Sequence, residues 1–125
     1  MAVWTPDELD RIGGATELRI ASRRADGTLR RETTIWHVRS GDDLYVRSAH
    51  GPQNGWFRAA KAAGSGSVSA GGVDKDVTFE PADPAVRDAL DAAYHAKYDR
   101  YGPSPVAAVT GPDVLETTLR VVPQG

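Results

Sequence analysis

The sequence predicts a mainly β protein with flanking helices, in which six short strands form a small antiparallel β-barrel, either closed or split. Segments of alternating apolar and polar residues are separated by tight turns, which is typical of antiparallel strands. Capped helical segments occur at the N-terminus, midway through the strand series and near the end. Closing a small antiparallel sheet hides its edges, and the 125 residues fit a single domain over 1–125.

A short helix is predicted at the N-terminus. Thr5 directly precedes Pro6, and Glu8 stands three residues after Thr5, which is a capping-box pattern. The pair Gly13-Gly14 is expected to end this helix, because glycine is the residue most common after a helix C-terminus.

Three strands are predicted next, over residues 16–24, 29–40 and 44–48. The first two are joined by Asp-Gly at 26–27, the strongest short signal for a hairpin, and the last two by Gly-Asp-Asp at 41–43. The middle strand is rich in β-branched and aromatic residues. This order predicts an antiparallel meander.

The middle of the chain predicts a short helix over residues 55–64, with Asn54 as its N-cap and Gly64 as its end. Two further strands, over 66–72 and 76–81, follow around a Gly-Gly turn. The helix therefore interrupts the series of strands, as expected for a barrel with an inserted helix.

A long helix is predicted over residues 84–101, because Asp83 can cap it and Pro84 suits its first position. Residues 102–113 contain several prolines and glycines, which predict a connecting segment with room for one short turn. A sixth strand is predicted over 115–122.

Composition excludes several classes of function. The net charge of −2 argues against a nucleic-acid binder, which normally carries a basic surface. The absence of cysteine excludes disulfides, thiolate metal sites and cysteine nucleophiles. The N-terminus does not resemble a signal peptide, and no apolar run approaches the length of a membrane span. We therefore expect a cytoplasmic protein without nucleic-acid or membrane partners.

Residues 21–72, ASRRADGTLRRETTIWHVRSGDDLYVRSAHGPQNGWFRAAKAAGSGSVSAGG, resemble the central part of the deazaflavin-dependent nitroreductase family. That family belongs to the FMN-binding split-barrel superfamily. The shared order is strand, basic turn with glycine, strand, Gly-Asp, strand ending in Ser, glycine loop and aromatic-led helix. The late segments DALDAAYHAKYDRYG and ETTLRVVP resemble an uncharacterised bacterial family of unknown function.

The resemblance implies a split barrel that binds FMN or a deazaflavin coenzyme and transfers a hydride to or from a small organic molecule. It also implies a homodimer. Two alternatives stay open: a non-enzymatic module that carries a cofactor or haem, and a purely structural homodimeric barrel.

The loop of residues 47–56 is the first candidate site. Its glycines lead into a helix N-terminus, whose N–H groups suit a phosphate or a carboxylate. The alternative is a plain connection in which Trp56 and Phe57 plug the barrel. His50 stands where the related family has glycine, so it either closes the pocket or contributes to it. The cofactor contacts implied here by the resemblance are Ser48, Ala49, His50, Gly51 and Trp56.

Four arginines flank the predicted hairpin, namely Arg23, Arg24, Arg30 and Arg31. A guanidinium can hold a phosphate with two hydrogen bonds, whereas arginines at a hairpin are more often solvated or paired with neighbours such as Glu32. We expect at least two of them to be of the second kind. The resemblance implies that Arg24, Arg31, Thr33 and Thr34 contact the cofactor.

A tyrosine stripe on the late helix is the next candidate. Tyr94, Tyr98 and Tyr101 share one helix face with Lys97. As cofactor contacts, Tyr94 and Tyr98 would form an aromatic wall beside the flavin ring. The favoured alternative is an apolar stripe that packs on the barrel while its hydroxyls reach water.

Two histidines are considered for chemistry. No serine or aspartate stands at relay spacing from His37, so a structural role for it is favoured over an acyl-transfer triad. His95 stands between Asp91 and Asp99 at four-residue steps, which permits a weak metal site. A solvated acidic face is the favoured interpretation, and we expect no metal.

Overall fold

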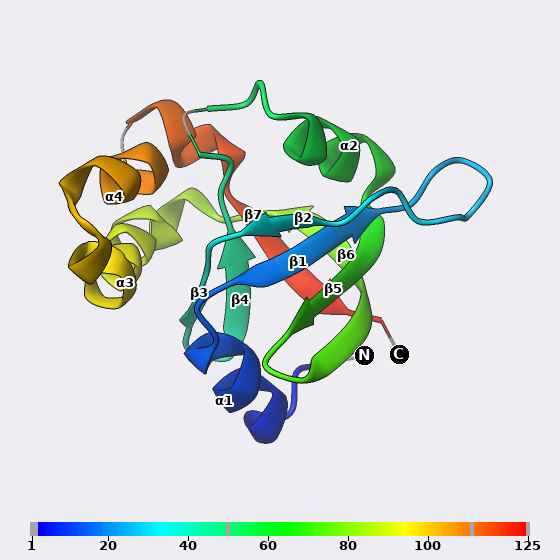
Figure 1. Ribbon diagram of the computed structural model, residues 1–125, viewed down its shortest axis with the longest axis horizontal. Coiled ribbons are helices and arrows are strands. Elements are labelled where there is room, and N and C mark those ends of the chain that lie inside the picture. The colour runs from blue at the N-terminus through cyan, green and yellow to red at the C-terminus, as the bar shows by residue number, and fades with distance from the viewer. Residues whose placement is uncertain (1–2, 50, 111, 125) are drawn as a thin grey trace.

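The computed structural model describes residues 3–49, 51–110 and 112–124, without the side chains of residues 112, 113 and 115, as a helix-flanked barrel (Figure 1). Within these ranges the α-helices are α1 Pro6–Gly14, α2 Gly55–Ala63, α3 Arg87–Tyr98 and α4 Pro103–Thr110. The strands are β1 Leu18–Ser22, β2 Thr33–Ile35, β3 His37–Ser40, β4 Asp43–Val46, β5 Ser65–Ala70, β6 Val73–Pro81 and β7 Leu119–Pro123. Short 3₁₀ helices are η1 Pro84–Val86, η2 Asp99–Tyr101 and η3 Pro112–Thr117.

The described strands form one antiparallel sheet in the order β2-β1-β5-β6-β7-β4-β3. The two end strands, β2 and β3, are consecutive in the chain and are separated only by Trp36. The sheet must therefore curl until its two ends meet at that residue, which gives a near-closed barrel. The architecture is mixed α and β and is consistent with the predicted split barrel.

The prediction of six strands was one too few, because the segment 29–40 is divided. Thr34 pairs with Arg19 on β1, whereas Val38 pairs with Tyr45 on β4. Trp36 lies at the break, and the chain changes partner strand there. Alternation of side chains cannot reveal such a break, since both halves keep the pattern of a strand.

The two shorter predicted helices are confirmed. At α1 the Thr5 side chain accepts a hydrogen bond from the Glu8 N–H at 3.1 Å, and the Glu8 carboxylate accepts one from the Thr5 N–H at 2.9 Å. At the end of α2, Gly64 adopts the left-handed conformation with φ of 71°. Asn54 occupies the N-cap position of α2, as predicted, although its side chain makes no capping hydrogen bond.

The late region differs from the prediction in three places. The helix expected over 84–101 begins as η1, continues as α3 and ends as η2. The connector 102–113 holds the eight-residue helix α4 rather than one short turn. The last strand begins at Leu119 rather than at 115, because the segment before it forms η3, where the Thr117 hydroxyl donates to the Val114 carbonyl at 2.7 Å.

Buried apolar residues form two clusters. The first fills the barrel, and Trp4 closes it through a 2.9 Å hydrogen bond from its indole N–H to the Val121 carbonyl. The second lies between α3, α4 and the outer face of β3 and β4, and its members are Val38, Tyr45, Leu90, Tyr94, Tyr98, Val106 and Val109. This second cluster fixes α3 and α4 together on one side of the barrel, on the left in Figure 1.

Among the described residues, no helix combines the length and the apolar character that crossing a membrane requires.

Candidate functional site

Two clefts meet along β2. Cleft A has a volume of about 430 Å³ and is lined by Glu17, Thr33, Thr34, Ile35, Trp36, Arg47, Ala49, Asn54, Trp56, Pro105, Ala108 and Val109. Cleft B has a volume of about 370 Å³ and is lined by Ile20, Ser22, Arg24, Arg30, Arg31, Thr33, Gly55, Trp56 and Ala59. Thr33 and Trp56 belong to both linings, so the two clefts form one groove.

Trp36 gives cleft A an aromatic wall. Its ring stacks on Tyr98, with centroids 4.0 Å apart and planes only 7° from parallel. The Tyr98 hydroxyl donates to the Thr16 carbonyl at 2.7 Å and accepts from the His37 N–H at 3.1 Å, so the supporting ring is anchored from two sides. Trp36 is only half-buried, and it lines the cleft while Tyr98 does not.

Arg47 lies beneath cleft A with its side chain wholly buried. The guanidinium pairs with the Asp91 carboxylate and donates to the Val109 carbonyl at 2.9 Å and to the Thr118 hydroxyl at 3.1 Å. It also donates to the Arg87 carbonyl at 3.3 Å. One side chain therefore ties the end of β4 to α3, to α4 and to the segment before β7.

The loop 47–56 is held by its own side chains. The Asn54 amide donates to the Ser48 hydroxyl at 2.9 Å and to the Ala49 carbonyl at 2.7 Å. Ser48 is buried and donates to the Gly51 carbonyl. Of the sequence-predicted contacts here, Ala49 lines cleft A, whereas Ser48 and Gly51 line neither cleft. His50 lies outside the described residues.

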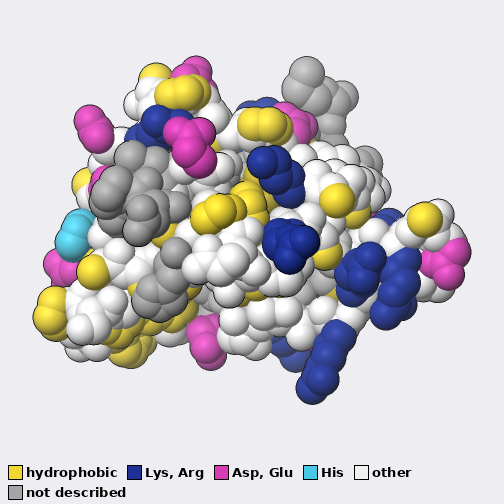
Figure 2. All heavy atoms as spheres, turned by 90° about the horizontal axis from the view of Figure 1, so that it is seen from above, with side chains coloured by type: hydrophobic (Ala, Val, Ile, Leu, Met, Phe, Trp, Pro, Cys, Tyr) yellow, Lys and Arg dark blue, Asp and Glu magenta, His cyan; other side chains and the backbone are white. Residues whose placement is uncertain are grey.

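Cleft B carries the positive charge. Arg24, Arg30 and Arg31 line it, next to the first turn of α2, and its described lining contains no carboxylate. Arg24 donates to the Leu29 carbonyl at 3.1 Å, while Arg30 and Arg31 form no ion pair with any described residue. Figure 2 shows Lys and Arg side chains gathered at the end of the molecule that carries the hairpin. Outside the cleft, Arg23 pairs with Asp76 at 2.8 Å.

The tyrosine stripe packs into the core. Tyr94 and Tyr98 are wholly buried in the second cluster and line neither cleft. Burial raises the pKa of both phenols, that of Tyr98 to about 12. The expectation that these hydroxyls reach water was wrong, since that of Tyr98 is bonded to backbone and that of Tyr94 is buried without a partner among the described residues.

His37 has a structural place between β3, α1 and α3. Its Nε2 lies 2.5 Å from the Ile12 carbonyl, and Lys97 donates to the His37 carbonyl at 2.9 Å. Burial, aided by the nearby Lys97 charge, lowers the pKa of His37 to about 4, so the ring is neutral at pH 7. Burial also lowers the pKa of Lys97, to about 8.

The four-residue spacing of acids around His95 does not form a metal site. His95 pairs with Asp99 at 2.8 Å, but Asp91 turns to Arg47 instead. Among the described residues, no group of three or more potential ligands is arranged to hold a metal ion.

Sequence reasoning missed Glu17, Trp36 and Arg47 as parts of this site. An arginine at the end of a strand is normally expected in solvent, and nothing in the sequence links Arg47 to Asp91. The place of Trp36 at the break of the barrel depends on the pairing of distant strands, which the local sequence does not reveal.

Solved structures with the same fold include three proteins of different description. One is described as an F420 reductase, with 20% identity, a TM-score of 0.59 and coverage of 94% of this chain and 93% of that one. Another is a FAD-binding protein from Mesorhizobium loti, with 20% identity, a TM-score of 0.60 and coverage of 98% and 92%. The third is HutZ, the haem storage protein from Vibrio cholerae, with 12% identity, a TM-score of 0.62 and coverage of 100% and 92%.

At these identities the similarity shows a shared fold. No curated protein matches the sequence. Residues 8–121 match the bacterial family described as "Uncharacterized protein conserved in bacteria (DUF2255)", which spans most of the chain. The protein therefore belongs to the DUF2255 family, on a fold shared with FMN-binding split barrels.

Proposed function

We propose that the chain binds a flavin-type cofactor, FMN or a deazaflavin coenzyme, in the groove formed by clefts A and B. The observation that carries this proposal is the junction of two unlike clefts across Thr33 and Trp56. A cofactor of this type joins a planar ring to a phosphate-bearing tail. Such a molecule matches an aromatic cleft that continues directly into an arginine-lined one.

The residues present fit both parts of such a cofactor. Arg24 and Arg31 would hold the phosphate, assisted by N–H groups of the first turn of α2. Trp56 and the hydroxyls of Thr33 and Thr34 would contact the ring. Each cleft has a volume within the usual range for ligand pockets of about 300–1,000 Å³.

When bound, the cofactor supplies hydride transfer to or from a small organic molecule. The chain's own residues bind it, fix the ring against β2 and keep water from the buried side of cleft A. No acid or base from the chain is required for that chemistry. The FAD-binding and F420-reductase descriptions of proteins with this fold support the choice of cofactor.

Titration of the purified chain with FMN and with the deazaflavin coenzyme, followed by fluorescence, tests the proposal. We expect at least one to bind with Kd below about 100 μM, which corresponds to weak binding. The variant Arg24→Gln/Arg31→Gln should bind more weakly, whereas Arg100→Gln, an exposed arginine on η2, is the matched control. Failure of both cofactors to bind would contradict the proposal.

Turnover then separates enzyme from carrier. Oxidation of the reduced cofactor by a small acceptor would support the oxidoreductase, and binding without turnover would support a carrier. A haem-binding module would instead show a Soret band on titration with haem. We also propose a homodimer, as the resemblance implies, which sedimentation of the purified chain tests.

A further inference from the structure

We infer that the end of cleft A around Trp36 and Glu17 is a substrate subsite for planar, conjugated molecules that carry a positive charge. This inference rests on the proposed function in one respect, the assignment of cleft B to the cofactor's phosphate. The subsite itself follows from the aromatic packing and the charges of cleft A.

Trp36 offers a rigid platform for stacking. Tyr98 covers one face of the Trp36 ring, so a ligand in cleft A contacts the part of the ring that Tyr98 does not cover. Tyr101 lies 5.7 Å away with its plane tilted by 41°, and it is 45% exposed. Because Tyr98 is held by hydrogen bonds to Thr16 and His37, the platform is ordered before any ligand arrives.

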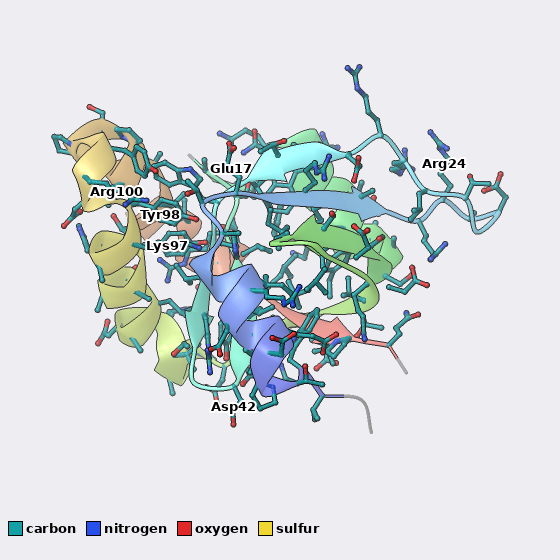
Figure 3. The ribbon with its side chains drawn as sticks, turned by 60° about the horizontal axis from the view of Figure 1, so that its bottom comes forward. Glu17, Arg24, Asp42, Lys97, Tyr98 and Arg100 are labelled. Atoms are coloured by element: carbon teal, nitrogen blue, oxygen red, sulfur yellow. The ribbon has the colours of Figure 1, made fainter. Side chains whose placement is uncertain are left out.

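The accessible charge of this end is negative. Glu17 and Arg47 are the ionisable residues in the described lining of cleft A. Arg47 is wholly buried and paired with Asp91, whereas Glu17 is exposed and forms no ion pair with any described residue. Figure 3 labels Glu17 where the chain enters β1, on the side of the barrel near Tyr98.

The cations near this end are engaged elsewhere. Lys97 donates to the His37 carbonyl, and its ammonium lies 5.1 Å from the centre of the Tyr98 ring. Arg100 lies 5.0 Å from the centre of the Tyr101 ring and donates to its hydroxyl. Lys97 and Arg100 both lie outside the lining of cleft A.

Together these features favour a cationic ring. A positive charge above an indole face is attracted by the negative charge of the π-system, and a carboxylate at the rim adds to this attraction. The three guanidinium groups of cleft B repel the same molecule. The charges of the groove therefore favour the cofactor's anionic tail at the hairpin and the cationic substrate ring at Trp36.

Three small molecules that share one ring but differ in charge test the subsite. They are 1-methylnicotinamide, a pyridinium cation methylated on its ring nitrogen, neutral nicotinamide and the anion nicotinate. Each is titrated into the ¹⁵N-labelled chain without cofactor, and the indole N–H signals of its three tryptophans are followed. We expect the Trp36 signal to move, with apparent affinity in the order cation, neutral, anion. The Trp4 indole, which donates to Val121 inside the barrel, should stay in place.

Variants separate charge from stacking. Glu17→Gln should weaken binding of the cation about threefold and leave the neutral molecule unchanged, as expected for one exposed charge pair. Asp42→Asn, an exposed carboxylate outside cleft A, is the matched control and should change nothing (Figure 3). For the variants at Trp36 the indole N–H signal of Trp56, which also lines cleft A, is followed instead. Trp36→Leu should abolish binding of all three molecules, and Trp36→Phe, which keeps a ring, should weaken it.

Two results would overturn the inference: binding of nicotinate as tightly as the cation, or titration shifts that leave Trp36 unmoved. Both are independent of the cofactor titration, because the spectra are recorded on the chain alone. A chain that binds FMN but shows either result keeps the proposed function and loses only the substrate subsite. A chain that binds the cation at Trp36 but no flavin keeps only the subsite.

Discussion

The two ends of the groove are built in different ways. In cleft A, Trp36 stacks on the buried ring of Tyr98, and Arg47 holds the surrounding elements together from below. In cleft B, Arg24 and Arg31 are exposed side chains of a hairpin. Changes at cleft A should therefore cost stability, whereas changes at cleft B should alter binding and leave the fold intact.

The largest effect is expected from Arg47→Met. This change leaves the Asp91 carboxylate without its cation and the Val109 carbonyl without its donor. Removing one partner of a buried pair costs about 3–5 kcal/mol, and because Asp91 is 31% exposed we expect a value near the lower limit. Denaturant unfolding measures it.

The matched control is Arg87→Met, because the Arg87–Glu116 pair is exposed. Loss of such a pair costs about 0–1 kcal/mol. Equal losses for the two variants would show that Arg47 does not support cleft A in the way described.

A comparable loss of stability is expected when the pH is lowered, because of His37. Its folded-state pKa of about 4 lies below the ordinary value of 6.5, so the unfolded chain takes up the proton first as the pH falls. The free energy of unfolding therefore decreases between pH 6.5 and pH 4, by up to about 3 kcal/mol from this group. Denaturant midpoints across that range measure the loss.

His37→Gln should remove this part of the pH dependence, since an amide can still donate to the Ile12 carbonyl but does not titrate. His95→Gln, which changes an exposed histidine, should retain it. An unchanged pH dependence in His37→Gln would contradict the assignment to His37.

A smaller effect is expected from Tyr98→Phe. The ring that supports Trp36 stays, but the hydroxyl contacts to Thr16 and His37 are lost. We expect a loss of about 1–3 kcal/mol, because a buried N–H and a carbonyl lose their partner. Tyr101→Phe, at an exposed ring, should cost less than about 0.5 kcal/mol. A Tyr98→Phe chain as stable as wild type would show that the platform is not anchored by this hydroxyl.

The smallest effect on stability is expected in cleft B. Arg24→Gln and Arg31→Gln should each change the free energy of unfolding by less than about 0.5 kcal/mol, since both side chains are exposed. A loss of 2 kcal/mol or more, measured by denaturant unfolding, would contradict the claim that changes in cleft B leave the fold intact.

The sequence predicted those elements of the fold that depend on local signals. The capping box at Thr5, the hairpin and the Gly64 helix end are all present in the structure. The division of the strand at Trp36 depends on which distant strand each half meets, and local alternation carries no information about that. The helix α4 was missed because its prolines and glycine neighbours read as a connector.

The predicted site residues also fall into two groups, those that line the groove and those that do not. Arg24, Arg31, Thr33, Thr34 and Trp56 all line the groove, as does Ala49. The tyrosine stripe was compatible with a ligand wall or with a core, and spacing alone cannot separate the two, since both need an apolar helix face. The structure places Tyr94 and Tyr98 in the core.

The central claim, that cleft B takes the phosphate and cleft A the ring, is tested most directly by comparing FMN with riboflavin, which lacks the phosphate. Calorimetric titration of the wild-type chain should show FMN binding about tenfold more tightly, as expected from charge-assisted hydrogen bonds. Arg24→Gln/Arg31→Gln should lose this advantage while still binding riboflavin. Equal affinity for FMN and riboflavin in the wild-type chain would contradict the account.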